Sequence, residues 1–459
     1  MITSPRSDTP LSLGPEAGLF RRPGEGSLGR TFLLLCILFL LSGVCNSMLD
    51  TLNRHFQNSF AINKMKSALV QNAFYLGYFF MALPAGMLAR RLGYKGGMMI
   101  GLGVITLGAL WFIPATRIGT FGAFLAGLFI LAAGFTCLET IANPYATVLG
   151  PHETAAARIN LAQSCNGLGW MLGPATAGYF IFSSTAEVNK SNDALYLPYL
   201  LLGLLAGAML VVIGFSRVPD LHAEEEQAAR ATQRPPKPLR RRWHFTLAIA
   251  AQFCYVAAQT GVFSYFINYV VAEVPPLDPG WTAHLPGYMT ALREGHYQLT
   301  DRGAATLLSV GGFGLFLLGR LTGSLALRVL RPHRLLAAYS ALNTLVMLGV
   351  VLRLGWFSVG ALFFSFFLMS ISYPTIFALG IHGLGEQTKR ASSFLVMAIL
   401  GGAFMPMLMG WLADHGGMRA GFLMPMVLFA LIAAYGLTWP RLEALDRDDG
   451  VGEDNPNVA

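Results

Sequence analysis

Long apolar segments alternate with short polar segments along almost the whole chain, and this pattern predicts helices that cross a membrane. A helix spans a bilayer with about 20 apolar residues, and the apolar segments are long enough for this. Charged residues mark their ends. The predicted spans are residues 29–55, 65–89, 96–114, 119–149, 157–183, 195–215, 244–272, 303–330, 335–354, 356–381, 391–413 and 421–440. We therefore predict an all-α membrane protein with twelve transmembrane helices.

A polar stretch near the middle of the chain divides the spans into two groups of six. Residues 216–243 contain three consecutive glutamates and then a run of proline and arginine, a composition that cannot form an apolar core. We interpret this stretch as a cytoplasmic linker. The predicted parts are a cytoplasmic N-terminal tail at 1–28, a six-helix bundle at 29–215, the linker at 216–243, a second six-helix bundle at 244–440, and an acidic cytoplasmic tail at 441–459 that we expect to be disordered.

Three short patterns occur once in each half, in the same order and at nearly the same separation. Gly-x-Leu-Ala-x-Arg begins at Gly86 and Gly323, Pro-x4-Leu-Gly-x-His at Pro144 and Pro374, and Leu-Gly-x4-Pro-x3-Gly at Leu168 and Leu400. Matches in register indicate an internal repeat. Two parallel repeats of six helices are the organisation of the major facilitator fold, in which the substrate binds between the halves near the membrane midplane.

The charge distribution predicts the orientation in the membrane. Only 12% of the 459 residues are charged, about half the share in soluble proteins. With both termini cytoplasmic, 22 lysines and arginines lie in cytoplasmic stretches and 9 in outer ones. An excess of basic residues marks the cytoplasmic side. We predict a multi-pass protein of the inner (plasma) membrane with both termini cytoplasmic, and no nucleic-acid partner, because these charges anchor helix ends.

Cysteine and histidine are distributed in a way that does not favour a metal site or an enzyme. All five cysteines lie in apolar spans, without the spacing of a disulfide framework or a zinc site. A polytopic membrane enzyme would need His, Asp and Ser clustered at one membrane face, whereas the nine histidines are scattered over loops and helix ends. We expect no metal, no cofactor and no enzymatic activity.

Two carboxylates lie well inside predicted spans, Asp50 in the first and Glu139 in the fourth. An acid at the bilayer centre costs about 2.5–3.5 kcal/mol on insertion scales and is usually functional. Because desolvation favours the neutral form of a carboxyl group, each can bind and release a proton, which predicts proton coupling. The alternative is that one of them only pairs with Arg320. For Arg320 itself we expect a side chain that reaches the headgroups rather than the interior.

Uncharged polar residues form short stripes on the apolar helices. Residues three, four or seven positions apart share a helix face, and this groups Asn46 with Asp50, Glu139 with Asn143, Gln163 with Asn166, and Gln252 with Tyr255 and Gln259. Lipid cannot satisfy such stripes, so they face protein or water. One interpretation is hydrogen bonding between helices. The other is a binding site for a sugar, whose hydroxyl groups and apolar ring face suit amides, carboxylates and aromatic rings.

The loop after the second span resembles the signature Gly-x-Leu-Ala-Asp-Arg-x-Gly-Arg-Lys of major facilitators. Here it reads Gly86-Met-Leu-Ala-Arg90-Arg91-Leu-Gly93, with Arg90 in place of the aspartate. We predict that Gly86, Arg91 and Gly93 act in conformational change, since the glycines let this helix approach the other half. The arginines also serve as anchors on the cytoplasmic side.

The polar motifs together resemble the fucose–galactose–glucose:proton symporter family. The likeness is carried by Asn46-x3-Asp50, Gln71-Asn-Ala-Phe-Tyr-Leu-Gly-Tyr78, Leu138-Glu139-Thr-Ile-Ala-Asn143-Pro144, Leu149-Gly150-Pro151 and Asn160-Leu-Ala-Gln163-x2-Asn166. The runs Ala251–Thr260 and Tyr373–Phe377 are similar to the fucose branch of the family, because other branches tend to have glutamate where Gln259 stands.

The resemblance implies proton-coupled import of a hexose or deoxyhexose, with L-fucose first, by alternating access. It assigns proton coupling to Asp50 and Glu139, and places Gln163 and Asn166 beside Glu139 at the sugar. The implied partners of a monomeric carrier are the sugar, protons and membrane lipids.

Two departures bear on the substrate: Asn268 stands where the fucose branch has arginine, and the outer loop 273–302 is long. A glucose/galactose or N-acetylglucosamine carrier is the alternative within the family. A sugar sensor is a further alternative, although the short cytoplasmic segments offer no signalling domain.

Overall fold

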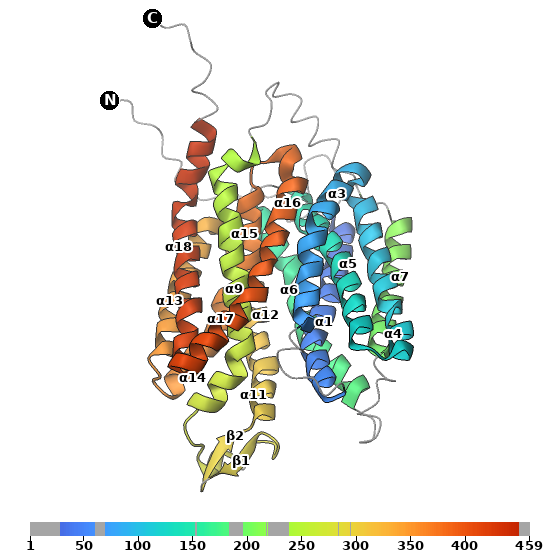
Figure 1. Cartoon of the computed structure of the whole chain (residues 1–459). Coiled ribbons are helices and arrows are strands. Elements are labelled where there is room, and N and C mark those ends of the chain that lie inside the picture. Colours follow the sequence, from blue (N-terminus) through green and yellow to red (C-terminus); the bar gives the residue numbers. More distant parts are fainter. Residues whose placement is uncertain are drawn as a thin grey trace, which may run out of the picture.

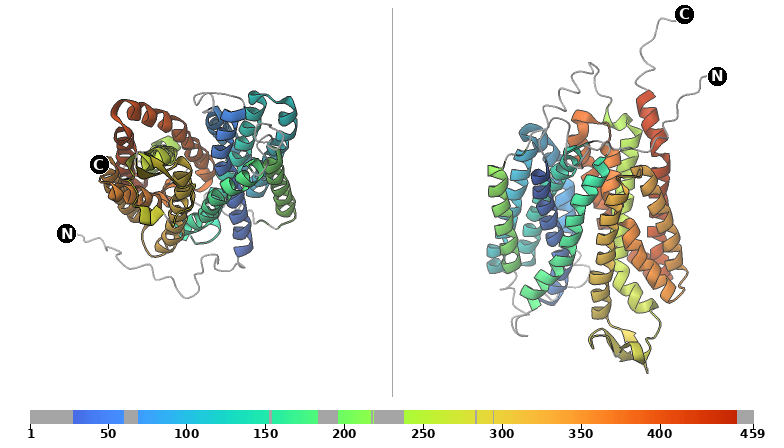
Figure 2. Two further views of the ribbon diagram at one scale, coloured as in Figure 1. Left: turned by 90° about the horizontal axis from the view of Figure 1, so that it is seen from below. Right: turned by 180° about the vertical axis from the view of Figure 1, so that it is seen from behind.

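The computed structural model describes residues 28–59, 69–151, 154–182, 196–216, 218, 238–282, 284–293 and 295–448. The predicted N-terminal tail up to residue 27, linker residues 219–237 and residues 449–459 lie outside the described residues. Within the described part, the chain forms two helical bundles that stand side by side (Figures 1 and 2).

The first bundle contains six crossings. Its helices are α1 (Gly29–Ser59), α3 (Leu69–Leu110), α4 (Phe112–Ile118), α5 (Phe121–Val148), α6 (Ala155–Phe182) and α7 (Tyr196–Phe215). The α3 helix is broken at Gly93, where φ is 69° and ψ is −177°. The part before Gly93 forms the second crossing, and the part after it forms most of the third, which α4 completes. A positive φ is accessible to glycine at little cost, so the chain reverses direction there without a longer loop.

The second bundle also contains six crossings, several of them built from two shorter helices. Its helices are α9 (Trp243–Glu273), α11 (Asp301–Leu307), α12 (Phe313–Ala326), α13 (Pro332–Val351), α14 (Trp356–Met369), α15 (Ser372–Ile381), α16 (Thr388–Met397), α17 (Gly401–Gly416) and α18 (Met418–Asp448). A π-helical segment, Leu308–Gly312, joins α11 to α12. The predicted spans therefore correspond to the observed crossings in order and number over the described residues.

Length and apolar composition support a membrane location for these helices. Ten segments of the described chain are long and apolar enough to cross a bilayer, and one of them, Leu69–Ile118, has 50 residues and contains two crossings. Large apolar side chains are exposed on the outside of both bundles, as on Leu107, Phe215 and Leu437. In a bilayer such side chains meet lipid rather than water.

The two ends of the bundle differ, and each is named here by what it carries. The terminal face is the end at which α1 begins and α18 ends. The hairpin face is the opposite end, which carries α10 (Pro279–Thr282), β1 (Thr290–Arg293) and β2 (His296–Leu299) (Figure 1). The strands pair antiparallel with Thr290 opposite Leu299. The long outer loop predicted at 273–302 thus folds into a small hairpin.

The expectation that the chain is disordered from residue 441 is wrong for the first eight residues of that tail, because α18 continues to Asp448. The Asp446 carboxylate accepts hydrogen bonds from the backbone N–H groups of Trp243 and His244 at 3.0 and 3.1 Å, and lies 2.6 Å from the Nδ1 of His244. It therefore caps the start of α9, where the N–H groups have no partner within the helix. This cap fixes the end of α18 against α9.

The halves contact each other on both sides of the bundle centre. Toward the terminal face, α16 packs against α3 and α5, and α6 packs against α12 and α15. Toward the hairpin face, the ring of Trp170 on α6 lies 6.0 Å from that of Phe263 and 5.6 Å from that of Phe313. Tyr75 on α3 lies against Gly402 on α17. The polar side chains described next lie between these two sets of contacts, which accounts for their burial.

Candidate functional site

Glu139 lies near the middle of α5 and is held by two other helices. Its Oε1 accepts a hydrogen bond from Ser42 Oγ on α1 at 2.9 Å and another from Tyr78 Oη on α3 at 3.1 Å. Glu139 is 8% exposed and Tyr78 is 3% exposed. A buried carboxylate is tolerated when its oxygens are hydrogen-bonded. The arrangement therefore holds an acid in the interior of the first bundle, in a defined orientation.

Asn46 extends this network along α1. Its Nδ2 donates to the backbone oxygen of Ser42 at 3.0 Å and to the Ser42 Oγ at 3.3 Å. Asp50 lies on α1 one turn beyond Asn46, and its side chain is outside the described residues. The Asn46 amide and the Glu139 carboxylate are thus connected through one serine.

A second pair of amides lies between α5 and α6. Gln163 Nε2 donates to Asn143 Oδ1 at 2.9 Å, and both residues are buried. Asn166 Nδ2 donates to the backbone oxygen of Phe39 at 3.2 Å, so this amide joins α6 to α1. These contacts show that hydrogen bonding between helices accounts for at least part of the predicted polar stripe.

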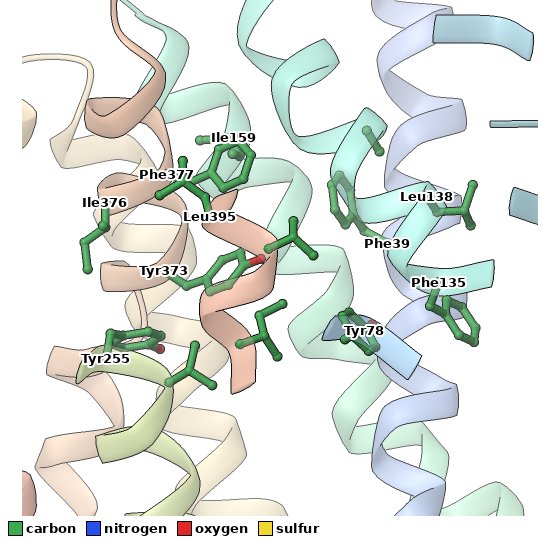
Figure 3. Packing of buried hydrophobic residues seen from close by; sticks show 14 of the residues in the cluster. Phe39, Tyr78, Phe135, Leu138, Ile159, Tyr255, Tyr373, Ile376, Phe377 and Leu395 are labelled. Carbon is green, nitrogen blue, oxygen red and sulfur yellow. The ribbon is translucent and has the colours of Figure 1, made fainter. Parts of the chain in front are cut away.

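The stripe on α9 is buried at two of its three positions. Gln252 and Tyr255 are fully buried, whereas Gln259 is partly exposed. The ring of Tyr255 lies 6.4 Å from the ring of Tyr373 on α15. Figure 3 shows these two tyrosines on helices of the second bundle, opposite Tyr78 and Phe39 on helices of the first. The Tyr373 hydroxyl lies on the side that faces the first bundle.

Several buried polar atoms on the helices that carry these residues have no hydrogen-bond partner among the described residues. They are Thr140 Oγ1, Asn143 Nδ2, both side-chain polar atoms of Gln252, Tyr255 Oη and Tyr373 Oη. Buried polar groups are nearly always hydrogen-bonded, and an unsatisfied one costs about 1–3 kcal/mol. Donors and acceptors of this kind, contributed by both bundles together with aromatic rings, are suited to a small ligand that carries several hydroxyl groups.

Arg320 is placed differently from the sequence prediction. The expectation that its side chain reaches the headgroups is wrong, because Arg320 is 4% exposed and lies between the bundles. Its Nε donates to the backbone oxygen of Ser370 at 3.1 Å, and its Nη1 donates to the backbone oxygen of Gln163 in the other half. Two carbonyl groups, one on α6 and one directly after α14, thus accept hydrogen bonds from the buried guanidinium.

The residues of the loop signature lie at the terminal face, where the halves meet. A side chain at Gly86 on α3 would collide with the Ser393 hydroxyl and crowd the backbone oxygen of Lys389 on α16, so glycine here allows the two halves to approach closely. Gly93 forms the break within α3. Arg91 is exposed, and the structure gives no specific contact for its side chain.

Further contacts close the terminal face between the two halves. Asn160 Nδ2 donates to Thr375 Oγ1 at 3.2 Å, and Ser324 Oγ donates to the backbone oxygen of Ala157 at 2.9 Å. The Nζ of Lys389 lies 4.5 Å from the ring centre of Tyr94, a distance typical of a cation–π contact. These bonds have to break if the two halves separate at this face.

Sequence reasoning did not identify several of the residues that build the site. Ser42 is the most direct omission, although its spacing of four from Asn46 would have placed it on the same face. Tyr78 and Tyr373 were visible only as members of motifs, because a single tyrosine in an apolar helix is not distinguishable from a core residue. No local pattern marked Arg320 as a residue that bonds to both halves.

Comparison with known proteins agrees with this architecture. Residues 32–398 match the family model of the Major Facilitator Superfamily. The L-fucose-proton symporter of Escherichia coli (strain K12) is 36% identical over 421 residues, which cover 87% of this chain and 91% of that protein. The glucose/galactose transporter of Brucella abortus (strain 2308) is 34% identical over 406 residues, which cover 88% and 92%.

Solved structures show the same relationship. The crystal structure of the transporter FucP in the outward conformation superposes with a TM-score of 0.74 at 34% identity, covering 89% of this chain and 98% of that one. The proton:xylose symporter XylE, at 14% identity and a TM-score of 0.66, covers 91% and 98% and shares the fold. The chain is therefore a member of the Major Facilitator Superfamily and, within it, of the fucose–galactose–glucose:proton symporter family.

Proposed function

We propose that this protein imports a hexose or deoxyhexose together with a proton, with L-fucose as the first candidate, and that it does so without chemical conversion of the sugar or a bound cofactor. The observation that supports this best is a buried, hydrogen-bonded acid, Glu139, in a chain whose two bundles both carry buried polar atoms without a partner among the described residues. In the parallel-repeat fold, a substrate bound between the halves is exposed to each side of the membrane in turn.

The chemistry of the unpartnered groups favours a sugar over an apolar drug. Tyrosine hydroxyls both donate and accept, the Asn143 Nδ2 donates, and the Gln252 side chain does both. A pyranose presents several hydroxyls around its rim and an apolar face suited to the rings of Tyr255 and Tyr373. Asn46, Gln163, Asn166 and Gln259 supply further amides in the surrounding polar network.

Proton coupling is proposed to use both intramembrane acids. Glu139 shares its network with Ser42 and Tyr78, so its protonation affects the hydrogen bonds at the sugar directly. Asp50 lies on α1 farther toward the hairpin face, which under the proposed orientation faces outward. It therefore serves as the entry point of the proton. We propose a carrier that acts as a monomer in the inner membrane. The charge asymmetry supports an orientation in which its terminal face is cytoplasmic.

The choice of sugar rests on the relatives. Symporters of L-fucose and transporters of glucose and galactose both align with most of the chain, and Gln259 and the motif at Tyr373 favour the fucose branch. The test is uptake into proteoliposomes with a panel of labelled sugars, with and without an acidic exterior. We expect L-fucose to be accumulated best. Transport of an amino acid, nucleoside or drug without competition by any hexose would overturn the proposal, whereas a preference for glucose or galactose would correct only the substrate.

The roles of the acids are tested by two isosteric neutral variants. With one proton per sugar, each pH unit is worth about 1.4 kcal/mol, which is a tenfold accumulation. Asp50→Asn is expected to abolish uphill uptake and to leave sugar binding intact. Glu139→Gln mimics the protonated acid, and is expected to retain sugar exchange and to lose its pH dependence. Counterflow and pH-jump uptake measure both. Accumulation by both variants at the wild-type level would mean that the carboxylates are structural.

A further inference from the structure

Three of the nine histidines gather around the end of α18 at the terminal face, although they lie far apart in the sequence. The ring of His333 on α13 stacks on that of Trp439 at 5.4 Å, and the ring of His382 lies 5.6 Å from the same indole. His244, in the first turn of α9, contacts Asp446 near the end of α18. A group of titratable side chains therefore lies at the terminal face of the second bundle, outside the proposed sugar site.

The contacts of His244 define its protonation state. Its Nδ1 lies 2.6 Å from the Asp446 carboxylate, and its Nε2 lies 3.1 Å from the backbone oxygen of His382. A carbonyl and an ionised carboxylate only accept hydrogen bonds, so both ring nitrogens carry a proton and the ring is a cation. The two oxygens of Asp446 also accept from the backbone N–H groups at the start of α9, as the ionised form does. The two side chains are 3% and 2% exposed, so this charge pair is buried.

The pair fastens three elements to one another. Asp446 belongs to α18, His244 to α9, and the backbone oxygen of His382 to the turn that follows α15. Two neutral hydrogen bonds hold the preceding part of α18: Tyr435 Oη donates to the backbone oxygen of His244 at 3.2 Å, and Trp439 Nε1 donates to a backbone oxygen of α15 at 3.3 Å. The helix up to Trp439 is therefore held by bonds without charge, whereas its last turns are held by the charge pair.

The other charged groups at this end of the bundle do not match His244. Glu443 on α18 lies 3.4 Å from the Nδ1 of His382, but that histidine side chain is 48% exposed. The arginines on the neighbouring elements keep their charge at every physiological pH. Histidine changes charge near neutral pH, and His244 differs from His333 and His382 because its partner is a buried carboxylate. The arginines are Arg240, Arg241 and Arg242 before α9, Arg331 and Arg334 at the start of α13, Arg390 on α16 and Arg441 on α18.

We propose that the end of α18 is a pH-sensitive latch at the terminal face, docked on α9 while His244 carries both ring protons and released when it loses one. Neutral histidine donates from one nitrogen only, so one of its two short contacts then joins two acceptors, and the attraction to the Asp446 carboxylate is lost. The docked state is therefore favoured at low pH and weakens as the pH rises.

The latch responds to the compartment at the terminal face, which is the cytoplasm under the proposed orientation. Histidine side chains change charge between about pH 5 and 8, the range in which such a compartment varies. The inference goes beyond the proposed sugar transport and does not depend on it, because its residues lie apart from Glu139 and the facing surfaces of the two halves.

The test is a distance measurement across the latch that requires no sugar. Spin labels at positions 240 and 445, both exposed, report how far the end of α18 lies from the start of α9 in a variant whose native cysteines are replaced. Labels at 240 and 329, the latter exposed in the turn after α12, form the control pair. Pulsed dipolar spectroscopy in liposomes, with the same pH on both sides of the membrane, gives the docked and released populations.

With the native latch residues, a rise from about pH 5 to about pH 8 is expected to increase the ratio of released to docked molecules about tenfold or more, since loss of one charge of a buried pair is costly. The distance between 240 and 329 is expected to stay constant. A distribution between 240 and 445 that does not change with pH would overturn the proposal.

Four variants separate a titrating latch from a general loosening at alkaline pH. His244→Gln is neutral at every pH and is expected to show the released ratio throughout. Asp446→Asn keeps an oxygen for the backbone N–H groups but removes the charge, and it should abolish the pH response; it keeps the test decisive if His244→Gln does not fold. His333→Gln and His382→Gln are the matched controls, because each removes a titrating ring nearby and keeps the backbone oxygen that His244 contacts.

The pH response should persist in both control variants. Its loss in either of them would show that His244 is not the group that titrates, and a response that survived in Asp446→Asn or in a folded His244→Gln protein would contradict the charge pair as its origin.

Discussion

The two tyrosines that face the site allow stability and substrate binding to be separated. Tyr255 is fully buried and Tyr373 is 8% exposed, and neither hydroxyl has a hydrogen-bond partner among the described residues. Replacement of either residue by phenylalanine removes only the oxygen and preserves the ring packing at 6.4 Å. Because no bond is lost within the protein, we expect stability to be unchanged or increased.

The expected magnitudes follow from the energetics of hydrogen bonds. An unsatisfied buried hydroxyl costs about 1–3 kcal/mol, which sets the upper limit of the gain in stability. A neutral hydrogen bond to the sugar contributes about 0.5–1.5 kcal/mol, so each variant is expected to bind sugar about two- to thirteen-fold more weakly. Thermal denaturation in detergent and calorimetric titration with L-fucose measure the two effects on the same sample.

Tyr199 supplies a matched control within the same chain. Its hydroxyl is also buried without a partner among the described residues, but its ring stacks on Phe112 at 3.6 Å in the first bundle, away from the facing surfaces of the two halves. Tyr199→Phe is expected to affect stability in the same direction and to leave sugar affinity unchanged. Wild-type affinity in both Tyr255→Phe and Tyr373→Phe would refute the assignment of these hydroxyls to the sugar.

Two further predictions concern orientation and the anchoring of α18. A cysteine at position 284 in a background without native cysteines should react with an impermeant reagent applied to intact cells, and one at position 230 should not; labelling of 230 would reverse the topology. Asp446→Ala removes the cap of α9 and the partner of the buried His244. It is expected to lower the free energy of unfolding by about 3 kcal/mol or more, which thermal denaturation measures. Glu443 lies 3.4 Å from the Nδ1 of His382 in a partly exposed contact, so Glu443→Ala should lower the free energy of unfolding by less than about 1 kcal/mol. Equal losses of stability in the two variants would contradict the role of the cap.

Local chemistry was sufficient to predict the spans, the two halves and the intramembrane acids. A bilayer imposes a rule on each segment separately, since every span must be long and apolar whatever its neighbours are. The repeat of Pro144 at Pro374 was recognisable because the same short pattern occurs in both halves of the chain. Glu139 was identifiable for the same local reason, because an acid is rarely tolerated inside an apolar helix without a function.

Helix interruptions followed from packing and were not predicted. The lengths of the apolar segments do not reveal the π-helical segment at Leu308–Gly312. Nor do they reveal that one crossing is divided into α14 and α15 and another into α16 and α17. The extension of α18 past residue 440 depends on Asp446 meeting the start of α9, about 200 residues earlier in the chain. A sequence shows the acidic residue but not the N–H groups that it caps.

The partners of the site residues were decided by the tertiary structure alone. Helical spacing shows which side chains share a face, but the rotation of each helix about its axis determines what that face meets. The bonds of Ser42 and Tyr78 to Glu139 come from three different helices, and those of Arg320 reach into both halves. Such contacts depend on how the two bundles pack, because the energy of a buried charge is set by the groups that surround it rather than by its neighbours in the chain.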